Sequence, residues 1–253
     1  MDYFHLLDCT FLYFMLHLIH SFFIGNEGIK VGREFNELFD QWSHTYDDTV
    51  TGNDPEYEEV FTHYDVILSE VAKNASGTIV EFGVGTGNLT KKLLNRGLNV
   101  YGLEPSSEMR KIAKDKLPGV PIWDGDFLEF PNISVPIHTF VSTYAFHHLT
   151  DEEKGKAIKK YSQLLTADGR ILFADTVFAT EDEKKKMIEW AKRKGFNRLA
   201  TDIETEYYTT IPVLQTLFNQ NDFSVEFKKL NRFVWLIDAK RQNLLDYYIK
   251  KYN

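Results

Sequence analysis

The residues best suited to ligand binding follow three successive apolar runs of the sequence. After the first run come Gly83, Gly85 and Gly87, in the pattern Gly-x-Gly-x-Gly. Glycines let the backbone turn sharply and approach a ligand without a Cβ clash, and the free amides at the start of a following helix can face a polar group. Glu104 ends the second run and Asp126 follows the third. The order strand, glycine loop, helix is typical of nucleotide binding.

Glu104 stands where a carboxylate can accept hydrogen bonds from both hydroxyls of a ribose. Enzymes that bind NAD also place an acid there, so Glu104 indicates an adenosine ligand without choosing between cofactors. The dinucleotide-binding fingerprint is Gly-x-Gly-x-x-Gly, whereas here the third glycine comes one residue early. Two plainer interpretations remain open, in which the glycines form an ordinary strand-to-helix turn and Asp126 belongs to a polar turn.

A histidine pair, His147 and His148, follows the predicted strand 138–143. Open α/β sheets bind ligands at the carboxyl ends of their strands, and a histidine pKa near neutrality suits a general base. A turn histidine with satisfied hydrogen bonds is an equally good interpretation, so the catalytic residue is left open, with His147 and Tyr46 as candidates. No metal site is expected, because no third ligand is identifiable near the pair and the chain has one cysteine, Cys9.

Alternating helices and strands must position these residues. Apolar residues at three-and-four spacing predict a helix over 55–74. We expect strands at 78–82, 99–103, 120–123, 138–143 and 170–174, and helices at 88–96, 107–116 (capped by Ser106), 151–165, 181–194 and 211–219. Repeated β-α units imply a parallel sheet with helices on both faces. The last strands, 223–230 and 233–239, are so closely joined that they must be antiparallel, and the charged helix 181–194 is expected to be solvated.

The composition excludes several classes of protein. Of the 253 residues 43% are hydrophobic, which is enough for a sizeable core. The 29 basic and 37 acidic residues give a net charge of −8 without a basic stripe, so we expect no nucleic-acid partner. A single cysteine permits no intramolecular disulfide and is typical of a reducing compartment, so we predict a cytoplasmic location.

The first thirty residues differ from the rest of the chain. Positions 3–24 are almost wholly apolar or aromatic, as in a membrane anchor, but Asp8 and three histidines interrupt them, and the uninterrupted stretch is shorter than the roughly 20 residues of a spanning helix. A signal peptide would need a basic start and a small-residue cleavage site. We favour translation from Val31, because GTG is both a valine codon and a bacterial start codon and Glu27-Gly28 can be encoded by a ribosome-binding-like purine run. No membrane partner is expected unless the leader 1–30 is real.

Two segments resemble the S-adenosylmethionine-dependent methyltransferases. Val-Glu-Phe-Gly-Val-Gly-Thr-Gly-Asn-Leu at 80–89 resembles their motif I, and Gly125-Asp126-Phe127 resembles the position that bonds the adenine amino group and packs on its ring. Beyond the superfamily, residues 32–35, 39–42 and 45–47 look like the YrrT group of bacterial methyltransferases, a resemblance that does not supply the substrate. It implies an α/β, Rossmann-like class I fold with a mostly parallel seven-stranded sheet, helices on both faces and a C-terminal antiparallel hairpin. A helical cap at 31–76 would precede a methyltransferase domain at 77–253.

The resemblance also implies the cofactor, S-adenosyl-L-methionine, and the residues that bind it. These would be Glu81, Gly83, Gly85, Gly87, Glu104, Asp126, Phe127 and Thr143. The segment 39–50 resembles a helix that covers the cofactor in many small-molecule methyltransferases. Trp42 and Tyr46 in this segment could touch the methionine tail, or simply pack a helix on the core.

We therefore expect methyl transfer from S-adenosyl-L-methionine to a small-molecule acceptor. The Asn/Asp-Pro-Pro-Tyr/Phe run of amino-group methylases is absent, and Cys9, in the leader, is no cytosine-C5 nucleophile. Tyr46, Thr143, His147 and the segment 195–210 would shape the acceptor pocket. Two alternatives are a non-catalytic protein that binds S-adenosylmethionine or S-adenosylhomocysteine, and an NAD-dependent oxidoreductase, against which the early third glycine counts. The acceptor and the oligomeric state are left open.

Overall fold

Residues 36–43 and 46–242 are described by the structure, a computed structural model. All of them belong to the compact unit Gly32–Asn253. The leader 1–30, with Cys9 and the translation start predicted at Val31, lies outside the described residues. None of the helices in the described ranges is long and apolar enough to cross a membrane. The predicted boundary between a cap, 31–76, and a domain, 77–253, stays a prediction.

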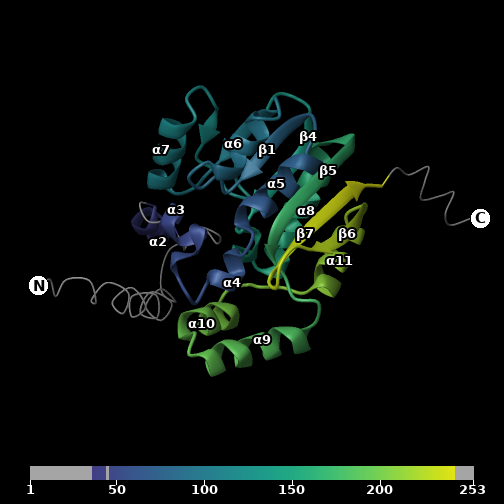
Figure 1. Cartoon of the computed structure of the whole chain (residues 1–253). Coiled ribbons are helices and arrows are strands. Elements are labelled where there is room, and N and C mark those ends of the chain that lie inside the picture. The colour runs from purple at the N-terminus through teal and green to yellow at the C-terminus, as the bar shows by residue number, and fades with distance from the viewer. Residues whose placement is uncertain (1–35, 44–45, 243–253) are drawn as a thin grey trace, which may run out of the picture. The chain divides into compact units, whose positions relative to one another are not determined.

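A seven-stranded sheet with the order β3-β2-β1-β4-β5-β7-β6 forms the centre of this unit (Figure 1). The strands are β1 (Thr78–Phe82), β2 (Asn99–Leu103), β3 (Ile122–Trp123), β4 (Ile137–Thr143), β5 (Leu165–Thr176), β6 (Phe223–Lys229) and β7 (Val234–Arg241). The first five pair in parallel, and β7 runs antiparallel to both β5 and β6. The predicted fold class, a mostly parallel sheet that ends in an antiparallel hairpin, is confirmed.

Helices bury both faces of the sheet, as a parallel sheet requires. Successive side chains of β1 alternate between two apolar clusters, with Ile79 in one and Val80 and Phe82 in the other. The helices among the described residues are α2 (Asn36–Trp42), α3 (Tyr46–Asp48), η1 (Thr49–Asn53), α4 (Glu58–Phe61), α5 (Tyr64–Asn74), α6 (Asn88–Leu94), α7 (Ser107–Lys116), η2 (Phe146–His148), α8 (Asp151–Leu164), α9 (Glu181–Lys194), α10 (Asn197–Thr205) and α11 (Ile211–Asn219). Buried residues of α5, α6, α9 and α10 join the first cluster, and those of α8 and α11 join the second.

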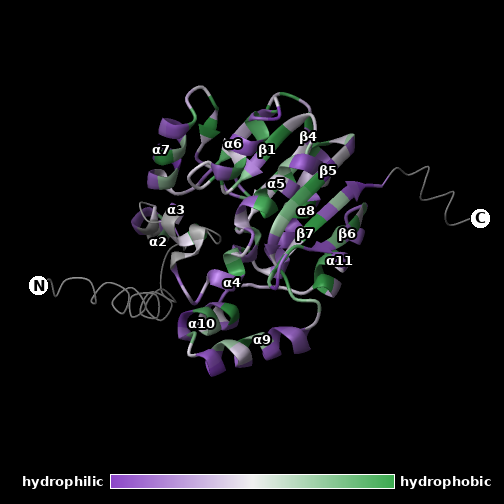
Figure 2. Ribbon diagram, in the orientation of Figure 1, coloured by the Kyte–Doolittle hydropathy of each residue, from purple (hydrophilic) through white to green (hydrophobic). Residues whose placement is uncertain are grey.

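Two helix starts follow directly from local side-chain chemistry. Thr150 and Glu153 form a capping box at the start of α8, and the Ser106 hydroxyl accepts a hydrogen bond from the Met109 amide at the start of α7, as predicted. Helix α9 is largely hydrophilic (Figure 2). However, Met187, Ile188 and Trp190 pack against the core, so α9 is not the fully solvated helix that its charges predicted.

The single helix predicted over 55–74 is wrong, because the chain breaks between α4 and α5. His63 adopts a left-handed backbone with φ 64°, which a continuous right-handed helix cannot contain. The break places Phe61 and Tyr64 on either side of the turn, and their ring centres lie 5.2 and 5.6 Å from that of Tyr144. Tyr144 directly follows β4, so this turn brings an N-terminal aromatic pair to the carboxyl end of the sheet.

Candidate functional site

A pocket lies where β1, β2, β3 and β4 end. Its lining includes Gly83 and Gly85 after β1, Glu104 after β2, Asp126 and Phe127 after β3, Thr143 and Tyr144 at the end of β4, and Tyr46 from α3. The empty volume of this pocket is ≈ 710 Å³, which includes space open to the solvent. The structure thus brings together the glycine loop and both predicted adenosine-binding acids, which are 43 residues apart at their extremes.

The glycine loop requires glycine for its backbone. Gly83, Gly85 and Gly87 have φ values of 65°, 56° and 92°, a region that L side chains rarely adopt. A Cβ on Gly83 would lie 3.0 Å from the Ala145 Cβ, and one on Gly87 would lie 2.6 Å from a Leu117 methyl carbon. Gly83 and Gly85 line the pocket, whereas Gly87 does not. Gly87 therefore serves the close packing of the loop against α7.

Glu104 is held in place by backbone amides. Its Oε2 accepts a hydrogen bond from the Gly85 amide at 2.7 Å, and its Oε1 accepts one from the Ser106 amide at 2.8 Å. Only 5% of the residue is exposed, and this burial raises the pKa of the carboxyl to about 7, against the opposing effect of the two amides. Each carboxylate oxygen can accept a further hydrogen bond, so an oriented acceptor faces the pocket.

Asp126 and Phe127 form the opposite part of the lining. The Oδ1 atom of Asp126 accepts hydrogen bonds from the Leu128 and Glu129 amides at 2.8 and 2.7 Å. This is the polar-turn geometry that the plainer interpretation predicted, and it also fixes the carboxyl at the pocket. The Phe127 ring is stacked on that of Phe82, with 5.0 Å between centroids, so the core of the sheet supports this side of the pocket.

Glu81, which the motif resemblance placed at the cofactor, does not line the pocket. It is 1% exposed, and its Oε2 accepts a hydrogen bond from the Thr90 hydroxyl at 2.6 Å. Burial raises its pKa to about 8. Its hydrogen-bond partner is thus Thr90 in the first turn of α6.

Two aspartates, Asp40 and Asp47, connect the N-terminal segment to the rim of the pocket. The sequence analysis did not identify either of them as a site residue. Asp40 accepts a hydrogen bond from the Ser106 hydroxyl at 2.5 Å and one from the Glu108 amide at 3.2 Å. Asp47 accepts from the Thr86 hydroxyl at 2.6 Å and lies 2.5 Å from the Lys116 ammonium. These contacts hold Tyr46 against the pocket, whereas the side chain of Trp42 lies outside the described part of the chain.

The contacts of Asp47 stabilise its ionised carboxylate. Burial alone would raise its pKa, but hydrogen bonds from Lys116, Thr86 and the side-chain amide of Asn88 outweigh that effect and hold the pKa below its ordinary value. The ionised form is therefore the one that the surrounding groups stabilise.

Tyr144 is a further pocket residue that the sequence did not indicate. Its φ of 55° is unusual for a tyrosine, and its buried hydroxyl has no hydrogen-bond partner within residues 36–43 and 46–242. A left-handed backbone costs about 1–3 kcal/mol, and an unsatisfied buried hydroxyl adds to that cost. Such features gather at functional sites, and nothing in the local sequence signals them.

His147 and His148 lie differently from the prediction. His148 lines the pocket, whereas His147 does not. The Nδ1 atom of His147 lies 2.6 Å from Asp175 Oδ1, and the backbone amide of His147 donates a hydrogen bond to Asp175 Oδ2 at 3.0 Å. Burial lowers the pKa of His147, but Asp175 and Glu206 raise it more, so the net shift is upward. Burial lowers the pKa of His148 well below its ordinary value, and His147 adds to the effect.

The segment 195–210 contributes to the surroundings of His147 without lining the pocket. Glu206 Oε2 lies 3.3 Å from His147 Nε2, and the Tyr208 ring is stacked on His147 with 4.6 Å between centroids. Burial raises the pKa of Glu206 to about 7. The expectation of no metal rested on the lack of a third ligand near the histidines, and the fold supplies one from 58 residues further along the chain.

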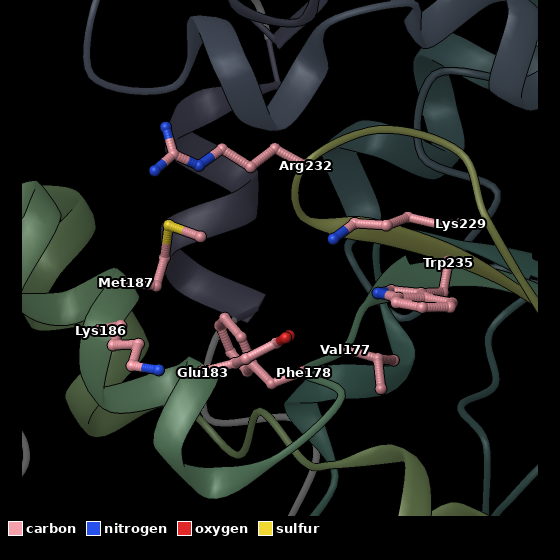
Figure 3. A pocket seen from close by; sticks show the side chains of 8 residues that line it. All are labelled: Val177, Phe178, Glu183, Lys186, Met187, Lys229, Arg232 and Trp235. Carbon is pink, nitrogen blue, oxygen red and sulfur yellow. The ribbon is translucent and has the colours of Figure 1, made fainter.

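A second hollow lies between α9 and the hairpin of β6 and β7, shown in Figure 3. Arg232 there lies 3.8 Å from the centre of the Trp190 ring and 2.7 Å from Glu59 Oε2. The Lys229 ammonium lies 5.3 Å from the centre of the Trp235 ring. These contacts account for Arg232 and Lys229 as parts of the packing, and the hollow shares no lining residue with the glycine-loop pocket.

Comparison with known proteins places the chain in a family. A family model for a methyltransferase domain matches residues 79–169. An uncharacterized methyltransferase of Bacillus cytotoxicus is 57% identical over 213 residues, which cover 84% of this chain and 100% of that protein. One of Bacillus cereus is 58% identical over the same shares.

A solved structure extends the likeness to the fold. Magnesium protoporphyrin IX methyltransferase from Synechocystis PCC 6803, determined with bound S-adenosylmethionine, is 15% identical, with a TM-score of 0.62 over 86% of this chain and 100% of that chain. At this identity the likeness concerns the fold alone. The chain belongs to the methyltransferase family of these Bacillus proteins and has the class I fold of S-adenosylmethionine-dependent methyltransferases.

Proposed function

We propose that this protein binds S-adenosyl-L-methionine in the glycine-loop pocket and transfers its methyl group to a small-molecule acceptor. The observation that carries the proposal is the meeting of Glu104, Asp126 and the glycine loop in one pocket at the carboxyl edge of the sheet. Glu104 would accept hydrogen bonds from the ribose hydroxyls, and Asp126 would accept one from the adenine amino group, with Phe127 against the ring. The residues present fit the group, because an oriented carboxylate, an aromatic wall and a side-chain-free turn are what an adenosine with a charged tail needs.

Methyl transfer from a sulfonium requires little acid-base catalysis by the protein. The sulfonium of the bound cofactor supplies an activated methyl group. The chain's own part is to exclude water and align the acceptor, and alignment alone lowers the barrier substantially. Beyond the glycine loop and the two acids, the pocket lining includes Tyr46, Thr143, Tyr144 and His148. We assign the acceptor to this part, with His148 replacing His147 from the predicted set.

The Tyr144 hydroxyl supports this assignment of an acceptor side. A buried donor without a protein partner among the described residues gains a hydrogen bond when a polar ligand group fills the pocket. The proposed cytoplasmic location rests on the single cysteine alone.

Calorimetric titration of the full chain with S-adenosylmethionine, S-adenosylhomocysteine and NADH tests the cofactor. Micromolar binding of the first two, about −8 kcal/mol, is expected, with no binding of NADH. Binding of NADH alone would contradict the proposal. Transfer of an isotopically labelled methyl group to a library of small acceptors then tests the reaction, and a protein that binds the cofactor but methylates nothing across the library would be a non-catalytic binder.

Asp47→Ala is expected to weaken S-adenosylmethionine binding by about tenfold. The substitution removes the acceptor for Thr86, Asn88 and Lys116, so the segment that holds Tyr46 at the pocket is less well ordered, and the loss of roughly 1.4 kcal/mol corresponds to that factor. Isothermal titration measures the change. Asp115→Ala is the matched control, because Asp115 is exposed on α7 beside Lys116. Equal affinity in the two variants would show that Asp47 does not hold the cap.

Cofactor affinity is expected to rise with pH through neutrality. The pKa of Glu104 is about 7 because of burial, so below that pH the free protein carries a protonated carboxyl that must lose its proton to accept both ribose hydroxyls. The affinity therefore falls as the pH falls, by up to about tenfold for each pH unit below the pKa. Titrations between about pH 6 and pH 8 measure this dependence. The Glu104→Gln variant should lack this component, and an unchanged pH profile in that variant would assign the dependence to another group.

A further inference from the structure

His147, His148 and Glu206 come together from two distant segments of the chain. The histidines lie in η2 after β4, and Glu206 directly follows α10. One potential ligand atom from each lies within 4.8 Å of those of the other two. Two imidazoles and one carboxylate are the donor set of several catalytic zinc sites.

The orientation of His147 is the second observation. Asp175, with a side chain only 3% exposed, contacts both the ring Nδ1 and the backbone amide of His147. This fixes the ring so that Nε2 faces Glu206 at 3.3 Å. Histidines that bind metals almost always give their other ring nitrogen to a carboxylate or carbonyl in this way. The 3.3 Å separation is also about that of two ligands on a tetrahedral Zn²⁺ with bonds of about 2.0–2.1 Å.

The charge balance around His147 is the third observation. The carboxylates of Asp175, Asp202 and Glu206 all interact electrostatically with His147. The buried cation of this region within the described ranges is Lys154, whose ammonium donates hydrogen bonds to the Leu149 and Tyr207 carbonyl oxygens.

The neighbouring Arg198 offsets part of this negative charge, because it interacts electrostatically with Asp202. Its guanidinium pairs with Asp54 and Glu56, at 2.7 and 3.1 Å. Carboxylates buried together are stable only where protons or cations balance them.

We propose that His147, His148 and Glu206 form a binding site for one divalent transition-metal ion of the zinc class. Three protein ligands leave a position open to water or to another ligand, as in catalytic rather than structural sites. Because His148 also lines the glycine-loop pocket, the ion adjoins the proposed acceptor side. Asp175 acts as the positioning residue that presents His147. The site does not depend on the proposed methyl transfer, and its test measures metal directly.

The test compares metal uptake by the untagged full chain and its variants. Metal-free protein is dialysed against Zn²⁺ and the bound metal is measured by mass spectrometry, while a Co²⁺ titration reports coordination by visible absorption. The wild type is expected to bind one ion more than Glu206→Gln and His148→Gln. Asp175→Asn keeps all three ligands and should weaken binding by about 10–100-fold.

Two controls isolate the site. Glu204→Gln changes an exposed carboxylate on α10 that pairs with Lys192 at the surface, and His63→Asn removes an exposed histidine whose left-handed backbone suits asparagine. Both should bind metal like the wild type, and the other histidines and Cys9 are the same in every comparison.

Equal metal content in the wild type, Glu206→Gln and His148→Gln would overturn the proposal and leave protons to balance the buried acids. If circular dichroism shows that a variant is unfolded, the metal content and the Co²⁺ spectrum of the wild type alone test the proposal. A Co²⁺ spectrum of the hydrated ion, with no coordination by protein, would also overturn the site.

Discussion

Glu104→Gln is expected to weaken S-adenosylmethionine binding by about 100-fold, the largest effect of any single substitution in the pocket. The two carboxylate oxygens accept from the Gly85 and Ser106 amides. A glutamine must turn its NH₂ group toward one of these donors, so one hydrogen bond is replaced by a repulsive contact. It also offers the ribose a neutral, single-oxygen acceptor. Hydrogen bonds to charged groups contribute about 1.5–3 kcal/mol each, and the loss of roughly 3 kcal/mol gives the expected factor.

Calorimetric titration measures this loss, and circular dichroism shows whether the variant is folded. The matched control is Glu152→Gln, since the Glu152 side chain is 78% exposed on α8 and pairs only with Lys156 among the described ion pairs. We expect the control to bind like the wild type. A Glu104→Gln variant that binds within about twofold of the wild type would remove Glu104 from the cofactor site and, with it, the main support for an adenosine ligand.

Phe82→Ala is expected to lower the free energy of unfolding by about 3–5 kcal/mol, the usual cost of deleting a buried phenylalanine ring. Phe82 is fully buried at the end of β1. Its ring centroid lies 5.0 Å from that of Phe127, 5.4 Å from that of Phe140 and 5.1 Å from that of Tyr161. Removing it leaves a cavity among large rings that cannot all move inward, and so the packing loss is only partly recovered.

Denaturant unfolding measures the change, with Val66→Ala as the control. Val66 is 62% exposed, and surface substitutions usually change stability by less than about 0.5 kcal/mol. Phe127 loses its stacked neighbour in the Phe82 variant, so we expect weaker cofactor binding as well. A loss of stability below about 1 kcal/mol would mean that the ring cluster closes over the gap.

Much of the fold could be predicted from local patterns. Apolar runs ending at Phe82, Leu103 and Thr143 predicted buried strands, and the two-residue gap before Phe233 predicted the antiparallel hairpin. The strand pairing shows that these runs lie in one sheet, as the right-handed connection of β-α units leads one to expect. The prediction failed at His63, because a left-handed residue inside an apolar periodicity leaves no mark on that periodicity.

The sequence by itself determined which polar and glycine residues stand at the strand ends. Gly83, Gly85, Glu104 and Asp126 each lie within a few residues of a strand's carboxyl end, and in a parallel sheet those ends meet at one edge. Their convergence follows from the order of the elements alone, which is why the sequence was enough to predict that they meet.

Tertiary structure alone decided which side chains close the pocket and which surround His147. Asp47 and Lys116 are 69 positions apart, and Glu206 reaches His147 from a segment beyond α10. The Phe61 and Tyr64 rings lie beside Tyr144, whose buried hydroxyl has no hydrogen-bond partner in the described part of the chain. Such contacts arise from packing between elements, and no periodicity or motif encodes them. A carboxylate or hydroxyl acquires its role here from the neighbours that folding brings to it.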